Sequence, residues 1–209
     1  VPFRFSLISI CTKMLVDLLK DKKIILGSAS PRRKELLKSL GIDFEIRVKD
    51  LKEEYPKNLK EKEISEFLAK QKSENLSKTL KSEEILITAD TIVIKGDRVL
   101  NKPKDKLEAK EMLQFLSGDE HSVITSVCLR NKQKQAIFSS TTKVFFKSLS
   151  AAEIDFYVKE YKPFDKAGAY GIQEWIGLVG IEKIEGSYFN VVGLPVVKLY
   201  QKLIQFVAL

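Results

Sequence analysis

Apolar side chains recur along the chain with two different spacings. Runs of apolar and β-branched residues predict strands, because such side chains pack well on a pleated surface, whereas apolar residues three and four apart predict helices. We expect strands at 24–26, 85–94, 99–100, 123–129, 136–146, 176–184 and 188–192, and helices at 31–40, 61–80, 107–116, 151–161 and 196–206. Strands and helices alternate without a repeat, which predicts an α/β fold with a mixed, twisted sheet flanked by helices.

The beginning of the chain lacks the pattern of a targeting or membrane segment. Charged residues leave too short an apolar stretch for a membrane span of about 20 residues, and no apolar core leads into a cleavage site. We expect residues 1–21 to be an N-terminal extension, with Met14 as the native start and residues 1–13 foreign to the natural protein. Residues 22–209 are expected to form one domain, whose two lobes surround a central cleft.

The segment that follows the first strand has the composition of a phosphate-binding turn. Ser30 suits the N-cap of a helix and Pro31 its first position. Arg32 and Arg33 then fall in the first turn, where the helix dipole disfavours each cation by roughly 0.3–1 kcal/mol. A phosphate bound by the first-turn N–H groups, Ser28 and the guanidinium groups would offset that cost. The alternative is two solvated arginines on an ordinary capped helix, and these residues alone leave both open.

Two charged residues occupy positions where apolar side chains are expected. Lys72 lies on the apolar stripe of the helix at 61–80, so it either extends to the rim or reaches into a cleft. Asp90 interrupts an apolar strand, where a carboxylate is costly to bury unless it meets a cation, a metal or several donors. The alternative is a bulge or a strand end capped by Asp90 and Thr91.

A glycine-containing loop at 165–173 interrupts the second half of the chain. Gly168 and Gly171 permit a positive φ or a close approach of the backbone to a ligand. The spacing of a dinucleotide fingerprint is absent.

Composition and charge narrow the range of functions. The chain has 209 residues and a net charge of +8, but its lysines are scattered and not interleaved with aromatic residues. This distribution argues against a surface that binds nucleic acid specifically, but it is compatible with binding of small anionic ligands. Cys11 and Cys128 lie far apart and His121 is the only histidine, for which we expect a structural or exposed role. Neither zinc nor a disulfide is supported, and we expect a cytoplasmic protein.

The unusual polar residues share one chemistry. They comprise Arg32, Arg33, Lys72, Asp90, Lys102 and the pair Glu53-Glu54. Carboxylates with lysines and arginines, but without a catalytic histidine or cysteine, indicate phosphate chemistry assisted by a divalent cation.

Six motifs in order resemble the Maf family of nucleoside triphosphate pyrophosphatases, from about residue 24 to residue 206. They are Ser28-Ala29-Ser30-Pro31-Arg32-Arg33, Leu68-Ala69-Lys70-Gln71-Lys72, Ala89-Asp90-Thr91, Lys102-Pro103, Asp165 to Gln173, and Gly186-Ser187-Tyr188 with Val192-Gly193-Leu194-Pro195. The resemblance implies a Maf/ITPase-like fold and hydrolysis of a nucleoside triphosphate to the monophosphate and pyrophosphate. It also implies Mg²⁺ or Mn²⁺ as cofactor, and a homodimer is common in the family.

Roles for single residues follow from the same resemblance. It implies that Asp90 accepts the proton of the attacking water, and that Glu53 and Asp90 bind the metal. It implies that Lys72 and Lys102 neutralise phosphate charge. The implied phosphate-binding residues are Ser28, Ser30, Arg32 and Arg33.

The motifs are similar to the subgroup that acts on dTTP and UTP, where positions matching Arg32, Thr91 and Gln173 are associated with base selectivity. A glutamine amide offers both a donor and an acceptor to a pyrimidine edge. Glu174 departs from the subgroup pattern, which has glycine there, and adds bulk and charge beside Gln173. The alternatives are the same chemistry on a purine or methylated nucleotide, or a non-catalytic nucleotide- or nucleic-acid-binding regulator of cell division.

Overall fold

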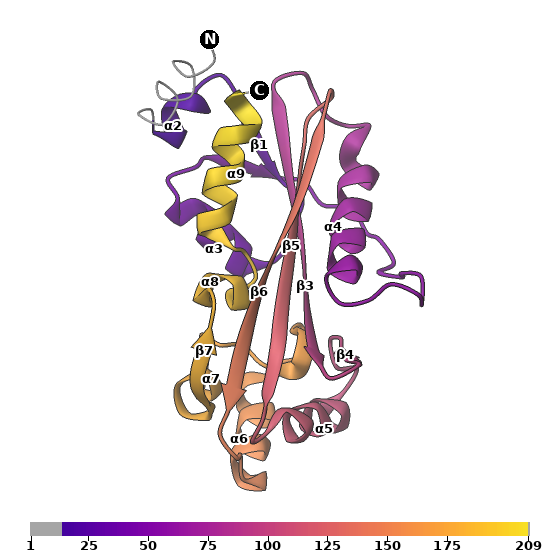
Figure 1. Ribbon diagram of the computed structural model, residues 1–209, viewed down its shortest axis with the longest axis vertical. Coiled ribbons are helices and arrows are strands. Elements are labelled where there is room, and N and C mark those ends of the chain that lie inside the picture. Colours follow the sequence, from indigo (N-terminus) through magenta and orange to yellow (C-terminus); the bar gives the residue numbers. More distant parts are fainter. Residues whose placement is uncertain (1–13, 209) are drawn as a thin grey trace, which may run out of the picture.

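A seven-stranded mixed sheet runs the length of the molecule in the computed structural model, which describes residues 14–208 (Figure 1). The strands on its main path follow the order β2-β1-β3-β5-β6-β7, and β4 pairs with β3. Their bounds are β1 Lys23–Leu26, β2 Phe44–Ile46, β3 Glu84–Lys95, β4 Arg98–Leu100, β5 Glu120–Arg130, β6 Gln135–Phe146 and β7 Ile181–Glu185. The predicted α/β fold with a mixed sheet is confirmed.

Helices cover both faces of this sheet. They are α2 Leu15–Leu18, α3 Pro31–Ser39, α4 Lys62–Ser77, α5 Lys106–Leu116, α6 Ala151–Tyr161, the 3₁₀ turn η1 Ala167–Ala169, α7 Trp175–Gly180, α8 Tyr188–Val192 and α9 Val196–Ala208. In Figure 1, α4 lies on one side of the long strands and α3 with α9 on the other, while α5 and α6 gather at the far end. Within residues 14–208, every helix is too short or too polar to cross a membrane.

The core has a large apolar cluster in each half of the molecule. Leu26 of β1, Leu37 of α3 and Leu203 of α9 belong to the first cluster, and all three are fully buried. Leu113 of α5 and Tyr157 of α6 belong to the second and are equally inaccessible. Each half therefore has its own apolar interior, and the long central strands connect the two.

The expected N-terminal extension packs onto this core from its helical part onward. Leu15 of α2 is fully buried in the same cluster as β1. The expectation for residues 1–13 lies outside the described part of the chain.

The neighbours of β3 leave part of one edge open. On one side β3 pairs with β5 from Leu86 to Ile94. On the other side it pairs in parallel with β1 over Glu84–Ile87 and antiparallel with β4 over Val93–Lys95. Residues 88–92 thus have no strand partner on that edge among the described residues. The gap lies at the carboxyl end of a parallel strand, where open α/β sheets bind ligands.

Two sequence predictions near the end of the chain are wrong. Residues 176–184, predicted as one strand, form most of helix α7 followed by β7, and residues 188–192, also predicted as a strand, form helix α8. The side chain of Ser187 accepts a hydrogen bond from the N–H of Asn190 and starts α8. Short apolar runs do not distinguish a buried strand from a buried helical turn, so the cap decides here. Strand β2 is short and was not predicted.

A buried ion pair fixes the chain where it leaves β2. The Glu84 side chain is fully buried and receives two bonds from the Arg47 guanidinium, both 2.9 Å long. The N–H of Lys81 donates a third bond to Glu84, at 2.9 Å. These bonds, chiefly those from Arg47, lower the pKa of Glu84 to about 2. Arg47 begins the irregular segment that leads to Glu53, so the pair fixes the start of that segment.

Stability should fall in acid because of this pair. A carboxyl group with a lowered folded-state pKa stabilises the fold above its unfolded value of 4.5 and loses that contribution as the pH falls toward 2. Between pH 6 and pH 3 the free energy of unfolding should lose roughly 2 kcal/mol through Glu84 alone. Urea unfolding of the Glu84→Gln variant should show a shallower pH dependence by that amount. Glu83→Gln, at an exposed neighbour, should match the wild type, and equal slopes for all three proteins would contradict this account.

Candidate active site

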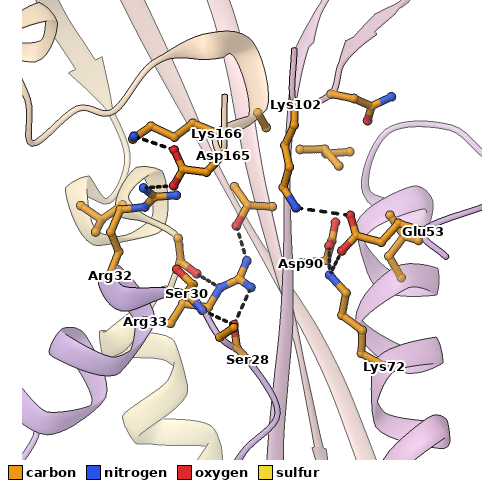
Figure 2. Close-up of a pocket in the computed structure, with 18 of the residues that line it drawn as sticks. Ser28, Ser30, Arg32, Arg33, Glu53, Lys72, Asp90, Lys102, Asp165 and Lys166 are labelled. Carbon is orange, nitrogen blue, oxygen red and sulfur yellow. Dashed lines mark hydrogen bonds and ion pairs between the residues drawn. The ribbon is translucent and has the colours of Figure 1, made fainter. Parts of the chain in front are cut away.

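A cleft of about 770 Å³ opens beside the unpaired edge of β3 (Figure 2). Its walls come from the β1–α3 turn, the segment after β2, helix α4, strand β3, the segment after β4 and the loop after α6. All ten site residues predicted from the sequence line this cleft: Ser28, Ser30, Arg32, Arg33, Glu53, Lys72, Asp90, Thr91, Lys102 and Gln173. The structure therefore brings together residues that are up to 145 positions apart, from 28 to 173.

One wall is the turn between β1 and α3. Ser30 occupies the N-cap of α3 and Pro31 the first position, as predicted, but Ser30 makes no side-chain capping bond. Its N–H instead donates to Oγ of Ser28 at 3.3 Å. The first turn of α3 therefore presents its backbone N–H groups to the cleft without a side-chain cap among the described residues, which suits an anionic ligand.

Arg33 fills the gap in the edge of β3. Its guanidinium donates to the carbonyl of Ala89 at 2.9 Å, the carbonyl of Gly193 at 2.8 Å, the hydroxyl of Thr91 at 2.9 Å and that of Ser28 at 3.3 Å. Burial lowers the pKa of Arg33. The guanidinium thus connects the β1–α3 turn, strand β3 and the α8–α9 junction. Most of its N–H groups already donate to protein acceptors.

Arg32 extends from the same turn toward the opposite side of the cleft. Its Nη1 lies 3.2 Å from Oδ2 of Asp165, and Oδ1 of Asp165 lies 2.8 Å from Nζ of Lys166. Burial opposes ionisation of Asp165, but the two cations outweigh it and lower its pKa. Figure 2 shows this row connecting the β1–α3 turn to the loop after α6.

An ion-paired acidic group forms the other wall. Nζ of Lys72 lies 2.5 Å from Oδ1 of Asp90 and 2.7 Å from Oε1 of Glu53. Nζ of Lys102 lies 3.7 Å from Oε2 of Glu53. Lys72 therefore reaches into the cleft and does not extend to the rim. Asp90 sits inside β3 in continuous register with β5, so the alternative of a bulge or strand end is wrong.

The two carboxyl groups differ in their pKa. Burial raises the pKa of Asp90 and outweighs the opposing effect of Lys72. Burial also acts on Glu53, but Lys72 and Lys102 outweigh it there and lower the pKa of Glu53. Asp90 is thus the group with the greater affinity for a proton.

These carboxylates suit a hard divalent cation only in part. Asp90 and Glu53 both direct an oxygen to the one ammonium of Lys72, so two hard donors share a small volume. Residues 14–208 contain no cluster of three or more side chains from His, Cys, Asp and Glu that could hold a metal. Mg²⁺ is commonly held by one or two carboxylates together with substrate phosphates and water. The donor set therefore fits a cation that binds with a phosphate ligand.

The glycine-containing loop closes the cleft beside Gln173. Gly168 has φ +70°, and a Cβ there would lie 3.1 Å from the side chain of Val93. Gly171 is buried and donates its N–H to the hydroxyl of Tyr157 at 3.0 Å. Gln173 is exposed and lines the cleft. Of the two predicted alternatives, the positive φ is confirmed at Gly168, and a close approach of this backbone to a ligand stays a prediction.

The sequence reasoning did not single out Asp165 and Lys166 as site residues, although both line the cleft. The one feature of the sequence that could have indicated them is the pair of opposite charges at the start of the loop that contains Gly168 and Gly171. Lys166 is almost fully buried, and neither its neighbours nor its spacing indicate that burial.

His121 has the structural role that the sequence predicts. The residue is 3% exposed, and Nε2 lies 2.7 Å from the hydroxyl of Tyr170. Burial lowers the pKa of His121 to about 3, so the ring is neutral near pH 7. Cys128 is buried and a free thiol.

The fold and the cleft define a class of α/β protein in which a helix N-terminus and an acidic pair line the two sides of one cleft. Comparison with known proteins gives the family: residues 23–206 match the model described as Maf-like protein, and the chain belongs to this family.

Two curated relatives are closely similar. The dTTP/UTP pyrophosphatase of Christiangramia forsetii is 51% identical over 190 residues, which cover 91% of this chain and 97% of the relative. The dTTP/UTP pyrophosphatase of Flavobacterium johnsoniae is 50% identical over 190 residues, with coverage of 91% and 98%. Among solved structures, a HAM1 protein from Coxiella burnetii has a TM-score of 0.46 at 14% identity, with coverage of 88% of this chain and 99% of that one. That likeness is too weak to bear on function.

Replacing Arg33 by lysine should destabilise the fold. One ammonium cannot reach the carbonyls of Ala89 and Gly193 and both hydroxyls, so buried acceptors lose their partners. We expect the free energy of unfolding in urea to fall by roughly 2–4 kcal/mol without nucleotide present. Arg32→Lys is the matched control, because its one partner within residues 14–208, Asp165, is exposed and such pairs contribute about 1 kcal/mol or less. Equal losses for the two variants would refute this role of Arg33.

Proposed function

We propose that this protein is a nucleoside triphosphate pyrophosphatase that hydrolyses dTTP and UTP to the monophosphate and pyrophosphate. The carrying observation is the arrangement at the unpaired edge of β3, where the uncapped N-terminus of α3 faces the Asp90–Lys72–Glu53 group across one cleft. An identity of about 50% to relatives named dTTP/UTP pyrophosphatase supports the choice of reaction and base.

The triphosphate binds between the two walls. The N–H groups of the first turn of α3 and the hydroxyls of Ser28 and Ser30 donate to phosphate oxygens, and Arg32 adds charge from the rim. Arg33 contributes one remaining N–H and holds the turn in shape. Lys102, which is exposed and 3.7 Å from Glu53, neutralises phosphate charge from the opposite side.

Asp90 and Glu53 would hold the divalent cation, Mg²⁺ or Mn²⁺, together with phosphate oxygens. When bound, the cation supplies charge neutralisation and favours deprotonation of water. Both carboxylates share Lys72, so this ammonium would have to leave at least one of them for the pair to hold the cation. In the free protein Lys72 and Lys102 together balance the charge of the two carboxylates.

Asp90 accepts the proton during hydrolysis. Water attacks the α-phosphorus, the bond from that phosphorus to the oxygen that bridges to the β-phosphate breaks, and pyrophosphate leaves with the bonding electrons. The proton of the water passes to Asp90. Burial raises the pKa of this carboxyl group, which makes it a better base than an ordinary exposed aspartate.

Base selectivity is assigned to Gln173, Thr91 and Arg32. The Gln173 amide is exposed to the cleft and offers a donor and an acceptor, which matches the edge of uracil or thymine. The hydroxyl of Thr91 is held by Arg33 and by Thr125, at 2.9 and 3.0 Å. Thr91 therefore has a fixed position in the cleft, between the proposed sites for the base and for the phosphates.

Asp90→Asn should abolish turnover while leaving the fold intact. The amide keeps the shape of the carboxylate but accepts no proton at neutral pH, so we expect kcat to fall by at least about 100-fold. Pyrophosphate release with Mg²⁺ or Mn²⁺ measures this. Asp97→Asn, in the exposed turn after the same strand, is the control and should retain wild-type activity. Full turnover by Asp90→Asn would rule out Asp90 as the base.

A nucleotide panel tests the substrate. We expect kcat/KM for dTTP and UTP to exceed that for CTP and GTP by about 10-fold or more, since a site that hydrogen-bonds one base edge rejects the others. Highest activity on a purine or methylated nucleotide would keep the chemistry and change the base. Absence of turnover on any nucleotide, together with steeply salt-dependent binding of DNA or RNA, would instead select the non-catalytic regulator.

A further inference from the structure

Glu174 turns away from the cleft although it directly follows Gln173. Its side chain is 25% exposed, and Oε1 lies 2.9 Å from Nζ of Lys166. Its Oε2 accepts a hydrogen bond from the hydroxyl of Tyr157 on α6. Glu174 is therefore outside the cleft lining and its charge is paired with Lys166, contrary to the expectation from its position in the sequence.

Glu174 is one member of a continuous polar row. Lys166 lies between two carboxylates, since its Nζ is 2.9 Å from Glu174 and 2.8 Å from Asp165. Asp165 in turn meets Arg32 at 3.2 Å. We call these residues, Tyr157, Glu174, Lys166, Asp165 and Arg32, the Glu174 row. It joins the loop that carries Gln173 to the β1–α3 turn, and Figure 2 shows its Lys166, Asp165 and Arg32 members.

The inner half of the row is buried and tightly fitted. The Lys166 side chain is 9% exposed, so its ammonium depends on the two carboxylates for stabilisation. Tyr157 is fully buried, and its hydroxyl receives the N–H of Gly171 at 3.0 Å. A Cβ at Gly171 would lie 2.9 Å from Cδ of Glu174 and 3.0 Å from Cε of Lys166. The backbone at Gly171, two residues before Gln173, is thus bonded to Tyr157 and packed against the side chain of Glu174.

We propose that Glu174 is a positioning residue for base selection: it fixes the turn that presents Gln173 and, through Lys166 and Asp165, sets the position of Arg32. This inference rests on the proposed nucleotide pyrophosphatase function. A small displacement of a base-reading amide weakens the favoured base more than a base it does not recognise, so selectivity depends on this support. The reacting residues Asp90 and Lys72 make no bond to the row.

The test compares Glu174→Gln with a matched control. Glutamine keeps the shape and can still accept from Tyr157, but it leaves Lys166 with one carboxylate. Glu153→Gln on α6 changes a carboxylate of nearly equal exposure, 26% against 25%, which also pairs with a lysine, Lys147. Glu153 lies outside the residues that line the cleft. Glu153 also accepts bonds from the N–H and hydroxyl of Ser150 at the N-cap of α6, which glutamine can still accept. The control therefore reports what the loss of an ion pair away from the cleft does to activity and stability.

We expect Glu174→Gln to reduce the ratio of kcat/KM between the best and the second-best nucleotide by about 10-fold. The change should arise mainly in KM for the best nucleotide, with kcat altered by less than about 3-fold. Glu153→Gln should leave the ratio unchanged. Tyr157→Phe, which removes only the hydroxyl, should change the ratio in the same direction, and it tests the row if Glu174→Gln does not fold.

A uniform loss of kcat/KM for every nucleotide, or a fall in Tm without any change in the ratio, would overturn the proposal. The nucleotide panel with the wild-type protein tests the proposed function separately, because it measures which nucleotide has the highest kcat/KM. The change of the kcat/KM ratio in the variants tests the role of Glu174, whichever nucleotide proves to be the best substrate.

Discussion

The unpaired stretch of one strand edge is the constraint on which the site depends. Strand β3 continues beyond the end of β1 before β4 joins it, and the intervening backbone must satisfy its hydrogen bonds in another way. Arg33 meets part of this need by donating to the carbonyl of Ala89, and it draws the β1–α3 turn and the Gly193 carbonyl to the same place. The cleft is therefore built where a sheet partner is missing, and an arginine takes the role of a neighbouring strand.

Alternation along β3 separates two kinds of chemistry. Consecutive residues of a strand face opposite sides, so Asp90 turns to Lys72 on α4 while Thr91 turns to Arg33 and Thr125. The proposed acid–base group and the proposed anion-binding turn thus lie on two faces of a single strand and line the same cleft. This explains why Asp90 and Thr91, adjacent in sequence, are assigned different tasks.

Much of this arrangement was predictable from the sequence. Local rules located the strand, turn and helix around Ser30 and Pro31, and the cost of burying a carboxylate marked Asp90 as unusual. The direction of Glu174 was not predictable, because it depends on Tyr157, which reaches the loop from a helix seventeen residues earlier. Helix α8 was not predicted because its short apolar segment is compatible with either a strand or a helix. The hydrogen bond to the Ser187 side chain, which decides between them, is visible only in the structure.

The long strands have a mechanical consequence. β3, β5 and β6 span 12, 11 and 12 residues, each roughly 40 Å at about 3.3 Å per residue, and they pass through both halves of the molecule. A hinge between the halves would have to break ladders shared by all three strands. We therefore expect the two halves to move as one rigid body. Any movement that adapts the cleft to a bound molecule is then expected in the segment after β2 and the loop after α6, which lie outside these strands.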